Sequence, residues 1–337
     1  MLRVFTPVRV ALGLAAAAVI AFAVLWFTPS DQYLLLPDKA HPVAPLISVK
    51  GGKEPTGPGG IYFVDVLVRK ANLLESFFPG IHEGSSLLPA AAINPPGVSE
   101  SARIQEDQQE MQRSQQIAAA VALTALGYKV TAKPTGVLIE QVAGNAPAAG
   151  KLQPTDVVVA VDGKPVRTPA ELRALIRLHK PGETVRLSVR RATGLRQVVV
   201  KTIADPNDPS LPIIGVIVTQ AAQIKLPVKV SIDAGGVGGP SAGLAFALGL
   251  MQELGRNVDH GYKVAATGEI GLDGSVSAIG GVEQKTFDAR RAKVDVFLVP
   301  AGDNAKEARR FAHGLRIVAV QSFAQALHAL ATLSAKR

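Results

Sequence analysis

The stretch "GGVGGPSAGLAFALGL", residues 235–250, decides how the second half of this chain is built. Its glycines predict a tight loop, and the apolar run that follows predicts a buried helix closed by Gly255. Ser241 stands where the loop meets the helix. Free backbone N–H groups and the positive end of the helix dipole lie there, so the junction is suited to bind an oxyanion. The alternative is that Ser241 only caps the helix.

A nucleophilic serine needs a base. His260, His313 and His328 follow it along the chain, but none of them sits in a recognisable motif. Lys285 ends the glycine-containing segment "IGGVEQK" and is the other candidate. A lysine serves as a base when burial lowers its pKa toward neutrality.

The composition bounds the class of protein. A chain of 337 residues with 47% apolar residues is long enough for two folded modules with buried cores. The absence of cysteine excludes a disulfide framework, a thiol nucleophile and thiolate metal sites. We expect neither a cofactor nor a metal ion.

The net charge of +9 is concentrated between Lys164 and Lys201. A nucleic-acid surface and a basic module held near an anionic membrane are two interpretations. We favour a solvated face, because no aromatic residues interleave with the basic ones as stacking platforms for bases. We therefore expect no nucleic-acid partner.

The N-terminal segment "VALGLAAAAVIAFAVLWF", residues 10–27, is uncharged and long enough to cross a bilayer. Arg3 and Arg9 precede it, which predicts a cytoplasmic N-terminus with the bulk of the chain outside the cell membrane. A cleaved signal peptide is the alternative, with "AFA" at 21–23 as its small residues. We favour an uncleaved anchor, because the apolar run continues after "AFA".

Residues 37–60 and 89–98 are rich in proline, glycine or small residues and predict loops. Residues 61–68, "IYFVDVLV", predict a strand. A helix is expected from Ser99 to about Gly127.

Residues 128–203 predict a β-rich module with a hairpin at Asp162-Gly163 and a helix capped by Thr168. The segments "TGVLIEQVAGNAPAAGKLQPTDVVVAVDGKPV" and "ELRALI" resemble a PDZ domain. PDZ domains bind an extended peptide as an added strand. The resemblance implies that peptide backbone pairs with one strand and that side chains of the helix line a pocket: Gly136, Val137, Leu138 and Ile139 for the strand, and Leu172, Leu175 and Ile176 for the helix.

The segment "GNAPAAGK", residues 144–151, half resembles an ATP-binding P-loop. Its glycines are one residue too far apart, and Leu152 stands where a Ser or Thr must bind magnesium. We expect no ATP binding through such a loop.

Three further segments resemble the peptidase domain of Lon proteases, in order and at matching spacing. They are "GGPSAGLAFALGL", "ATGEIGLDGSVSAIGGVEQK" and "ARRAKVDVFLVP", within residues 205–337. An anchor, a PDZ domain and a Lon-type domain together resemble a family of membrane-anchored bacterial Lon-like proteases without the ATPase module. Such domains tend to form rings, so the resemblance implies a homo-oligomer.

The resemblance also implies a catalytic apparatus. Ser241 and Lys285 match the serine–lysine dyad, and Thr267 matches the threonine that orients the lysine. The backbone N–H groups of Gly238 and Ser241 match the oxyanion donors. ATP-dependent Lon proteases usually carry an aspartate where this chain has Gly238.

The expected fold is thus a multidomain α+β chain. Its parts are the anchor (1–30), a strand, loop and helix region outside the membrane (31–127), a PDZ-like domain (128–203) and a Lon-type α+β peptidase domain (205–337). The expected function is ATP-independent serine endopeptidase activity on peptides or unfolded, membrane-proximal proteins, with the PDZ-like domain recruiting or gating substrates. The alternatives are a non-catalytic membrane scaffold and an α/β-hydrolase-type esterase, which would need an Asp and a His after Ser241.

Overall fold

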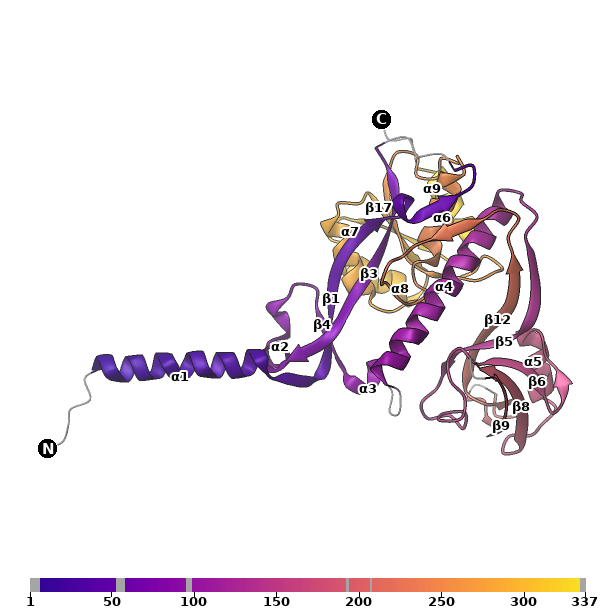
Figure 1. Ribbon diagram of the computed structural model, residues 1–337, viewed down its shortest axis with the longest axis horizontal. Coiled ribbons are helices and arrows are strands. Elements are labelled where there is room, and N and C mark those ends of the chain that lie inside the picture. Colours follow the sequence, from indigo (N-terminus) through magenta and orange to yellow (C-terminus); the bar gives the residue numbers. More distant parts are fainter. Residues whose placement is uncertain (1–6, 53–57, 95–98, 192–193, 207, 334–337) are drawn as a thin grey trace. The chain divides into compact units, whose positions relative to one another are not determined.

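The computed structural model describes residues 7–52, 58–94, 99–191, 194–206 and 208–333, which divide into two compact units (Figure 1). The first unit comprises the chain up to Ser114 together with Ile232–Ile270 and the chain from Val276 onward. The second unit comprises Gln115–Ser231 and Gly271–Ser275. The second unit is therefore inserted into the sequence of the first.

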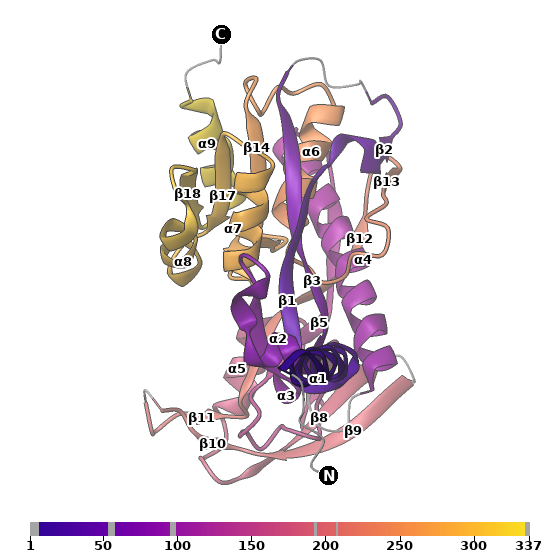
Figure 2. The same cartoon turned by 90° about the vertical axis from the view of Figure 1, so that its left-hand side faces the viewer.

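The main sheet of the first unit has the strand order β18-β17-β14-β3-β1-β4. β3 pairs with β14 in parallel and with β1 in antiparallel orientation, and Figure 2 shows β14, β17 and β18 beside the long β1–β3 pair. The strands are β1 (Pro29–Pro42), β3 (Gly60–Asn72), β4 (Ser86–Pro89), β14 (Lys263–Ala266), β17 (Val296–Pro300) and β18 (Arg316–Val320). Short strands complete the set: β2 (Ile47–Val49), β13 (Val230–Ile232), β15 (Glu269–Ile270) and β16 (Val276–Ser277).

Helices cover both faces of this sheet. Phe63 of β3 contacts Phe246 of α6 (Gly243–Glu253), with ring centroids 5.7 Å apart. Its neighbour Val64 belongs to a core formed with α7 (Val282–Arg291) and α8 (Asp303–Phe311). Successive strand residues point to opposite faces, so α6 lies on one face and α7 and α8 lie on the other. The remaining helices are α1 (Pro7–Phe27), α2 (Leu73–Phe77), α3 (Ala90–Ile93) and α9 (Phe323–Ala331), with 3-10 turns at Ala44–Leu46 and Pro79–Ile81.

The domain boundaries drawn from the sequence differ from this arrangement. We separated residues 31–127 from residues 205–337, but β1, β3 and β4 lie in the same sheet as β14, β17 and β18. The join is made by Gly60–Phe63, which pairs with Lys263–Ala266. A pairing between segments this far apart in the sequence leaves no local sequence signal. The prolines of β1 also led us to predict a loop for part of this strand.

The second unit is built on a sheet with the order β12-β5-β6-β8-β9 and with β7 paired to β6. Its core is a single apolar cluster between this sheet and α5 (Pro169–Ile176). The elements are β5 (Thr131–Val142), β6 (Val157–Val161), β7 (Lys164–Pro165), β8 (Thr184–Arg191), β9 (Gly194–Lys201), β10 (Ile203–Ala204), β11 (Pro212–Ile213) and β12 (Val216–Lys225).

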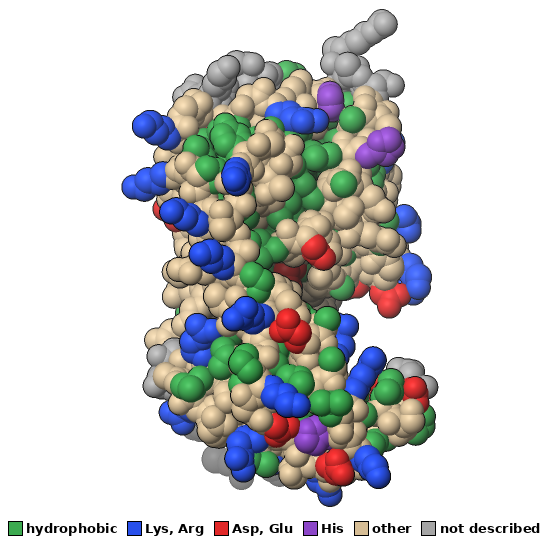
Figure 3. All heavy atoms as spheres, turned by 90° about the vertical axis from the view of Figure 1, so that its right-hand side faces the viewer, with side chains coloured by type: hydrophobic (Ala, Val, Ile, Leu, Met, Phe, Trp, Pro, Cys, Tyr) green, Lys and Arg blue, Asp and Glu red, His purple; other side chains and the backbone are tan. Residues whose placement is uncertain are grey.

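Two local predictions for this unit are confirmed. Thr168 caps α5 by accepting a hydrogen bond from the backbone N–H of Glu171. Asp162 and Gly163, both with positive φ, turn the chain between β6 and β7. The basic residues of 164–201 are exposed except for Arg191, and the lower part of the face in Figure 3 shows Lys and Arg dispersed among acidic and apolar side chains. This dispersion favours a solvated face.

Helix α4 (Glu100–Ala125) passes from the first unit into the second, with the change between Ser114 and Gln115. It ends close to Gly127, whose positive φ lets the chain leave the helix, as the sequence predicted. Part of α4 is alanine-rich and buried at Ala118–Leu123, whereas its N-terminal half is mostly polar and partly exposed.

Candidate active site

Ser241 lies in the turn that precedes α6, and α6 itself is buried along its whole length. The backbone carbonyl of Ser241 accepts hydrogen bonds from Gly268 N at 2.8 Å and from Thr267 Oγ1 at 3.2 Å. Its side chain is half-buried. The loop is therefore pinned from the side of β14, while the hydroxyl stays accessible.

Lys285 lies in the first turn of α7 and is buried, with 4% of its surface exposed. Gly281 precedes the helix in the left-handed region at a φ of 68°, and a Cβ there would stand 2.6 Å from a methyl group of Val66. Glycine is thus required for the approach of α7 to β3. The turn it makes directs Lys285 into the core of the unit.

The structure brings these two side chains together. Lys285 Nζ lies 2.7 Å from Ser241 Oγ, which is hydrogen-bonding distance. Thr267 is fully buried, and its Oγ1 lies 3.5 Å from Lys285 Nζ. The three residues come from the turn before α6, the loop after β14 and the first turn of α7. The resemblance of their motifs to the Lon peptidase domain implied that they meet.

Burial governs the electrostatics around the lysine. Desolvation lowers the pKa of Lys285 from 10.5 to about 8, against the opposing charges of Asp65 and Asp288. Desolvation also raises the pKa of Asp288 to about 7 and raises that of Asp65. The amine is thus neutral in a substantial fraction of molecules near pH 8, which is the state that accepts a proton.

The glycines before Ser241 are held by α4. Gly239 N donates to the backbone carbonyl of Asp107 at 2.8 Å, and Ser114 Oγ donates to the carbonyl of Pro240 at 2.9 Å. Within the described residues, no hydrogen bond occupies the N–H of Gly238 or of Ser241. The sequence had predicted these two groups as oxyanion donors. Sequence reasoning missed the part played by α4, because nothing in its polar N-terminal half indicates such a contact.

The structure explains why a glycine occupies position 238. A Cβ built on Gly238 would stand 2.7 Å from the Cβ of Asp107, which is closer than side chains tolerate. An aspartate here would collide with α4 and would bring a second carboxylate beside Asp107. The close approach of the helix therefore accounts for the absence of the aspartate usual in ATP-dependent Lon proteases.

Two segments of the chain match the models of known protein families. Residues 124–202 match the family model of the PDZ domain, and residues 217–332 match that of the Lon protease (S16) C-terminal proteolytic domain. The chain carries a PDZ domain and a Lon-type proteolytic domain. The resemblances proposed from the sequence are confirmed at this level.

Among curated proteins, the Lon-type domain is similar to Lon protease of Mycoplasma pneumoniae, 40% identical over 79 residues that make up 23% of this chain and 10% of the relative. Lon protease 2 of Bacillus subtilis is 34% identical over 104 residues, 31% of this chain and 18% of the relative. The chain thus spans a small part of the length of these relatives. Among solved structures, the PDZ domain of the SdrC-like protein of Listeria monocytogenes is 27% identical and covers 25% of this chain and 87% of that one, with a TM-score of 0.24.

The PDZ domain has a groove of about 330 Å³ between α5, β12 and the loop before β12. Leu172 and Ile176 line it from α5, as predicted, while Leu175 packs against the core instead. The other wall is formed by Leu211–Val216 and Val218, and Asp205, Arg173 and Arg177 also line the groove.

The predicted peptide-binding strand is wrong. Gly136, Val137, Leu138 and Ile139 lie in β5, which is paired with β12 on one side and with β6 on the other. Their backbone groups are already used, so no peptide strand can be added there without displacing β12. The groove strand is β12, which follows the stretch matched by the PDZ family model. The segment "PIIGVIVT" carried a signal for it, since a glycine precedes an apolar run.

Helix α1 contains an 18-residue stretch, Val10–Phe27, that is long and apolar enough to cross a membrane. Its side chains are largely exposed, as expected for a helix without a protein partner over most of its surface. A signal sequence near the N-terminus would pass the same test, so this is weak support for an anchor.

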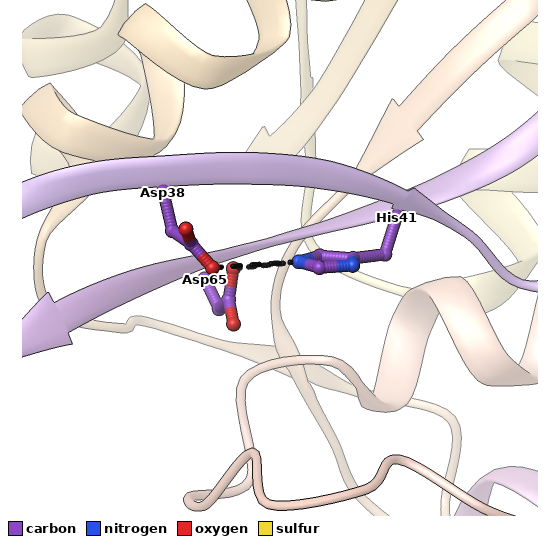
Figure 4. A group of neighbouring side chains, drawn as sticks. All are labelled: Asp38, His41 and Asp65. Carbon is purple, nitrogen blue, oxygen red and sulfur yellow. Dashed lines mark ion pairs between the residues drawn. The ribbon is translucent and has the colours of Figure 1, made fainter.

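Among the described residues, one group of side chains has the composition of a metal site. Asp38 and His41 of β1 and Asp65 of β3 offer ligand atoms that lie within 4.8 Å of one another (Figure 4). This group was not predicted from the sequence, because its members are spread over two strands that were not expected to pair.

Proposed function

We propose that the chain is a serine endopeptidase in which Lys285 acts as the general base for Ser241. The observation that carries this proposal is the 2.7 Å approach of a buried lysine amine to the serine hydroxyl. A surface lysine would remain charged and would have no proton-accepting role at neutral pH. The Lon-type match of residues 217–332 supports the same conclusion.

The reaction then follows from the geometry. Neutral Lys285 takes the proton of Ser241, and the serine oxygen attacks a peptide carbonyl. The N–H groups of Gly238 and Ser241 donate to the oxyanion, an interaction worth about 3–4 kcal/mol per donor in related sites. The lysine returns the proton to the leaving amine, and water hydrolyses the acyl-enzyme.

Thr267 is proposed as a positioning residue. Its hydroxyl donates to the carbonyl of Ser241 and lies near the amine of Lys285. It thereby links the backbone of the nucleophile to the base, and it fixes the rotamer of a side chain that is otherwise flexible.

A fluorophosphonate probe tests the dyad. The wild-type chain should be labelled at Ser241, and Ser241→Ala should abolish labelling. Lys285→Ala should slow labelling and peptide cleavage by at least about 1,000-fold, as for other residues that act as one catalytic unit. Lys306→Ala, which removes an exposed lysine, is the matched control. Equal labelling rates in Lys285→Ala and in the control would reject the assignment.

We propose that the PDZ domain recruits substrate by adding a peptide strand beside β12 in the groove against α5. Val216 lines the groove, whereas its neighbour Ile217 is exposed and lies outside the lining. Val216→Ser should weaken capture of an extended peptide, measured by fluorescence anisotropy, while Ile217→Ser should not. Both variants should keep the wild-type rate of fluorophosphonate labelling. Unchanged binding in Val216→Ser would place the peptide elsewhere.

We further propose that cleavage requires no ATP and acts on peptides or unfolded proteins. The chain carries no P-loop sequence. Unfolded casein should be cleaved equally with and without ATP, and a folded protein should resist in both conditions. Degradation of a folded substrate that depends on ATP would contradict this proposal.

The location and assembly are proposals as well. With α1 as an anchor and Arg9 on its cytoplasmic side, both units would lie outside the cytoplasmic membrane. A protease added to intact spheroplasts should then digest the PDZ domain. A ring-shaped homo-oligomer, implied by the Lon-type domain, should appear as a discrete high-mass species by mass photometry in detergent.

A further inference from the structure

The side chains of Asp38, His41 and Asp65 face one another across the β1–β3 pair. His41 lies opposite Phe63 and stacks on its ring, with centroids 4.9 Å apart. The register of β1 shifts between Pro37 and Ala40, so Asp38 lies in a bulge. A bulge re-aims a side chain. In Figure 4 one ring nitrogen of His41 points toward both carboxylates.

The separations are too long for hydrogen bonds. His41 Nε2 lies 3.4 Å from Asp65 Oδ1 and 3.6 Å from Asp38 Oδ2. His41 Nε2 and Asp65 Oδ1 are both buried, and neither has a hydrogen-bond partner. Buried polar atoms without partners are rare in folded proteins and call for an explanation.

Other histidines in the described part of the chain behave differently toward carboxylates. His82 Nε2 lies 2.8 Å from Glu75 Oε1, and His179 Nε2 lies 2.8 Å from Asp162 Oδ2. These are ordinary short hydrogen bonds. The His41 group is also ion-paired, but across a wider gap of 3.4 and 3.6 Å, against 2.8 Å in the other two pairs.

The size of the gap matches a tetrahedral ion. With metal–ligand bonds of about 2.1 Å, two ligands of a tetrahedral ion stand about 3.4 Å apart, whereas neighbouring ligands of an octahedral ion stand about 3.0 Å apart. The two distances from His41 Nε2 lie near the tetrahedral edge, and the ligand atoms of Asp38 and Asp65 lie within 4.8 Å of each other. All three side chains are partly exposed, at 35% for His41, 39% for Asp38 and 17% for Asp65, so an ion can enter from solvent.

The donor set selects the class of metal. One imidazole nitrogen with two carboxylate oxygens suits zinc and its neighbours, whereas calcium and magnesium prefer oxygen ligands alone. Asp288 of α7 supports the site, since its Oδ2 accepts a hydrogen bond from Asp38 N at 3.1 Å.

We propose that Asp38, His41 and Asp65 form a tetrahedral binding site for a divalent transition-metal ion of the zinc class, with a fourth position open to water. The site shares no residue with the serine–lysine pair, although the charge of Asp65 acts on Lys285. The sequence led us to expect no metal ion, and this proposal departs from that expectation.

Zinc and cobalt binding to the full chain in detergent test the proposal. The purified chain, free of any affinity tag, is stripped with a chelator and loaded with Zn²⁺. Metal content is measured by mass spectrometry after gel filtration, and affinity is measured by competition with a chromophoric chelator. Cobalt substitution reports geometry, because tetrahedral Co²⁺ absorbs visible light far more strongly than octahedral Co²⁺.

The wild-type chain should retain about one zinc ion, as a single three-residue site requires, and should show the strong cobalt bands. Asp38→Asn and His41→Gln should each weaken zinc binding by at least about 100-fold. Loss of a residue that only supports a metal ligand typically costs about 10- to 100-fold in affinity, and loss of a ligand should cost at least as much. His179→Gln, which alters a hydrogen-bonded histidine in the second unit, should bind like wild type. Zinc should also raise the melting temperature of the wild-type chain and leave that of His41→Gln unchanged.

Three results would overturn the proposal. They are no retained zinc in the wild-type chain, weak octahedral-type cobalt bands, and zinc affinity that is unchanged in both Asp38→Asn and His41→Gln. The cobalt spectrum of the wild-type chain decides the matter even if a variant fails to fold. None of these readouts depends on peptidase activity, so the result is separate from that of the fluorophosphonate test.

Discussion

Each unit buries an aspartate, and the two carboxylates differ in how fully hydrogen bonds and ion pairs compensate their burial. In the second unit, Asp156 is bound by Arg191 through both carboxylate oxygens, at 2.6 Å each, and also accepts from Gln153 N. In the first unit, Asp288 accepts one backbone hydrogen bond, and its Oδ1 is buried without a partner. Burial raises the pKa of Asp288 to about 7.

The difference separates a structural charge from the charges around the candidate active site. A bidentate arginine neutralises Asp156 and holds a turn next to β6. Around Lys285, burial lowers the pKa of the amine and raises that of Asp288, and the two shifts have the same cause. Incompletely compensated buried groups cost stability, and they gather where a protein needs perturbed proton affinities. The comparison can be tested at both sites.

The largest effect is expected from breaking the compensated pair. Arg191→Met should leave Asp156 buried without its cation and destabilise the second unit by about 3–5 kcal/mol. Hydrogen exchange of the β6 and β8 amides measures the loss within the full chain. Arg173→Met, at an exposed position of the same unit, should stay within about 0.5 kcal/mol of wild type. Equal effects of the two variants would show that Asp156 does not need the arginine.

The opposite sign is expected at the lysine. Its pKa is lowered from 10.5 to about 8, so between those values the unfolded chain holds a proton that the folded chain has lost. The stability contribution of this group therefore increases as the pH rises through that window, and below it the lysine costs about 3 kcal/mol. Lys285→Met should stabilise the first unit at pH 7 by up to that amount, and the gain should shrink toward pH 10. Denaturant titrations at several pH values measure it. A destabilised Lys285→Met at pH 7 would contradict the assignment.

A smaller effect is expected at the loop before Ser241. Gly238→Ala places a methyl group against Asp107, and overpacking of this kind costs about 1–3 kcal/mol. The loop should shift, and fluorophosphonate labelling should slow. Gly236→Ala meets nothing within 4 Å and should label at the wild-type rate. Labelling that is equally fast in both variants would show that the contact with α4 does not set the loop.

The smallest expected effect is the change in labelling rate with each pH unit. The rate at Ser241 should rise about tenfold per pH unit below the pKa of the base and level off above it. With the pKa of Lys285 at about 8, the plateau should begin near that pH. A profile that levels near pH 6.5 instead would point to a histidine as the base.

Local signals in the sequence predicted much of this molecule. Gly127 marked a helix end and Thr168 marked a helix start, because each acts on backbone close to it in the sequence. The resemblance of the motifs around Ser241, Thr267 and Lys285 to the Lon peptidase domain implied that these residues meet.

Pairings between distant segments were not predictable in the same way. β3 lies between β1 and β14, and β12 covers the edge of β5, yet neither contact has a sequence signal that names its partner. We expected an open strand edge at β5 for this reason, although β12 and β6 already pair with it. The group around His41 was missed for the same reason, because the bulge that aims Asp38 appears only once β1 and β3 are paired.

The insertion of one unit into the other sets an order for biosynthesis. β1 and β3 leave the ribosome before the PDZ domain, whereas β14, which pairs with the free edge of β3, is made after it. The PDZ domain can therefore complete its sheet first, while the β1–β3 hairpin waits with an open edge that invites wrong pairing. This edge of β3 gains its partner only when Lys263–Ala266 has been made.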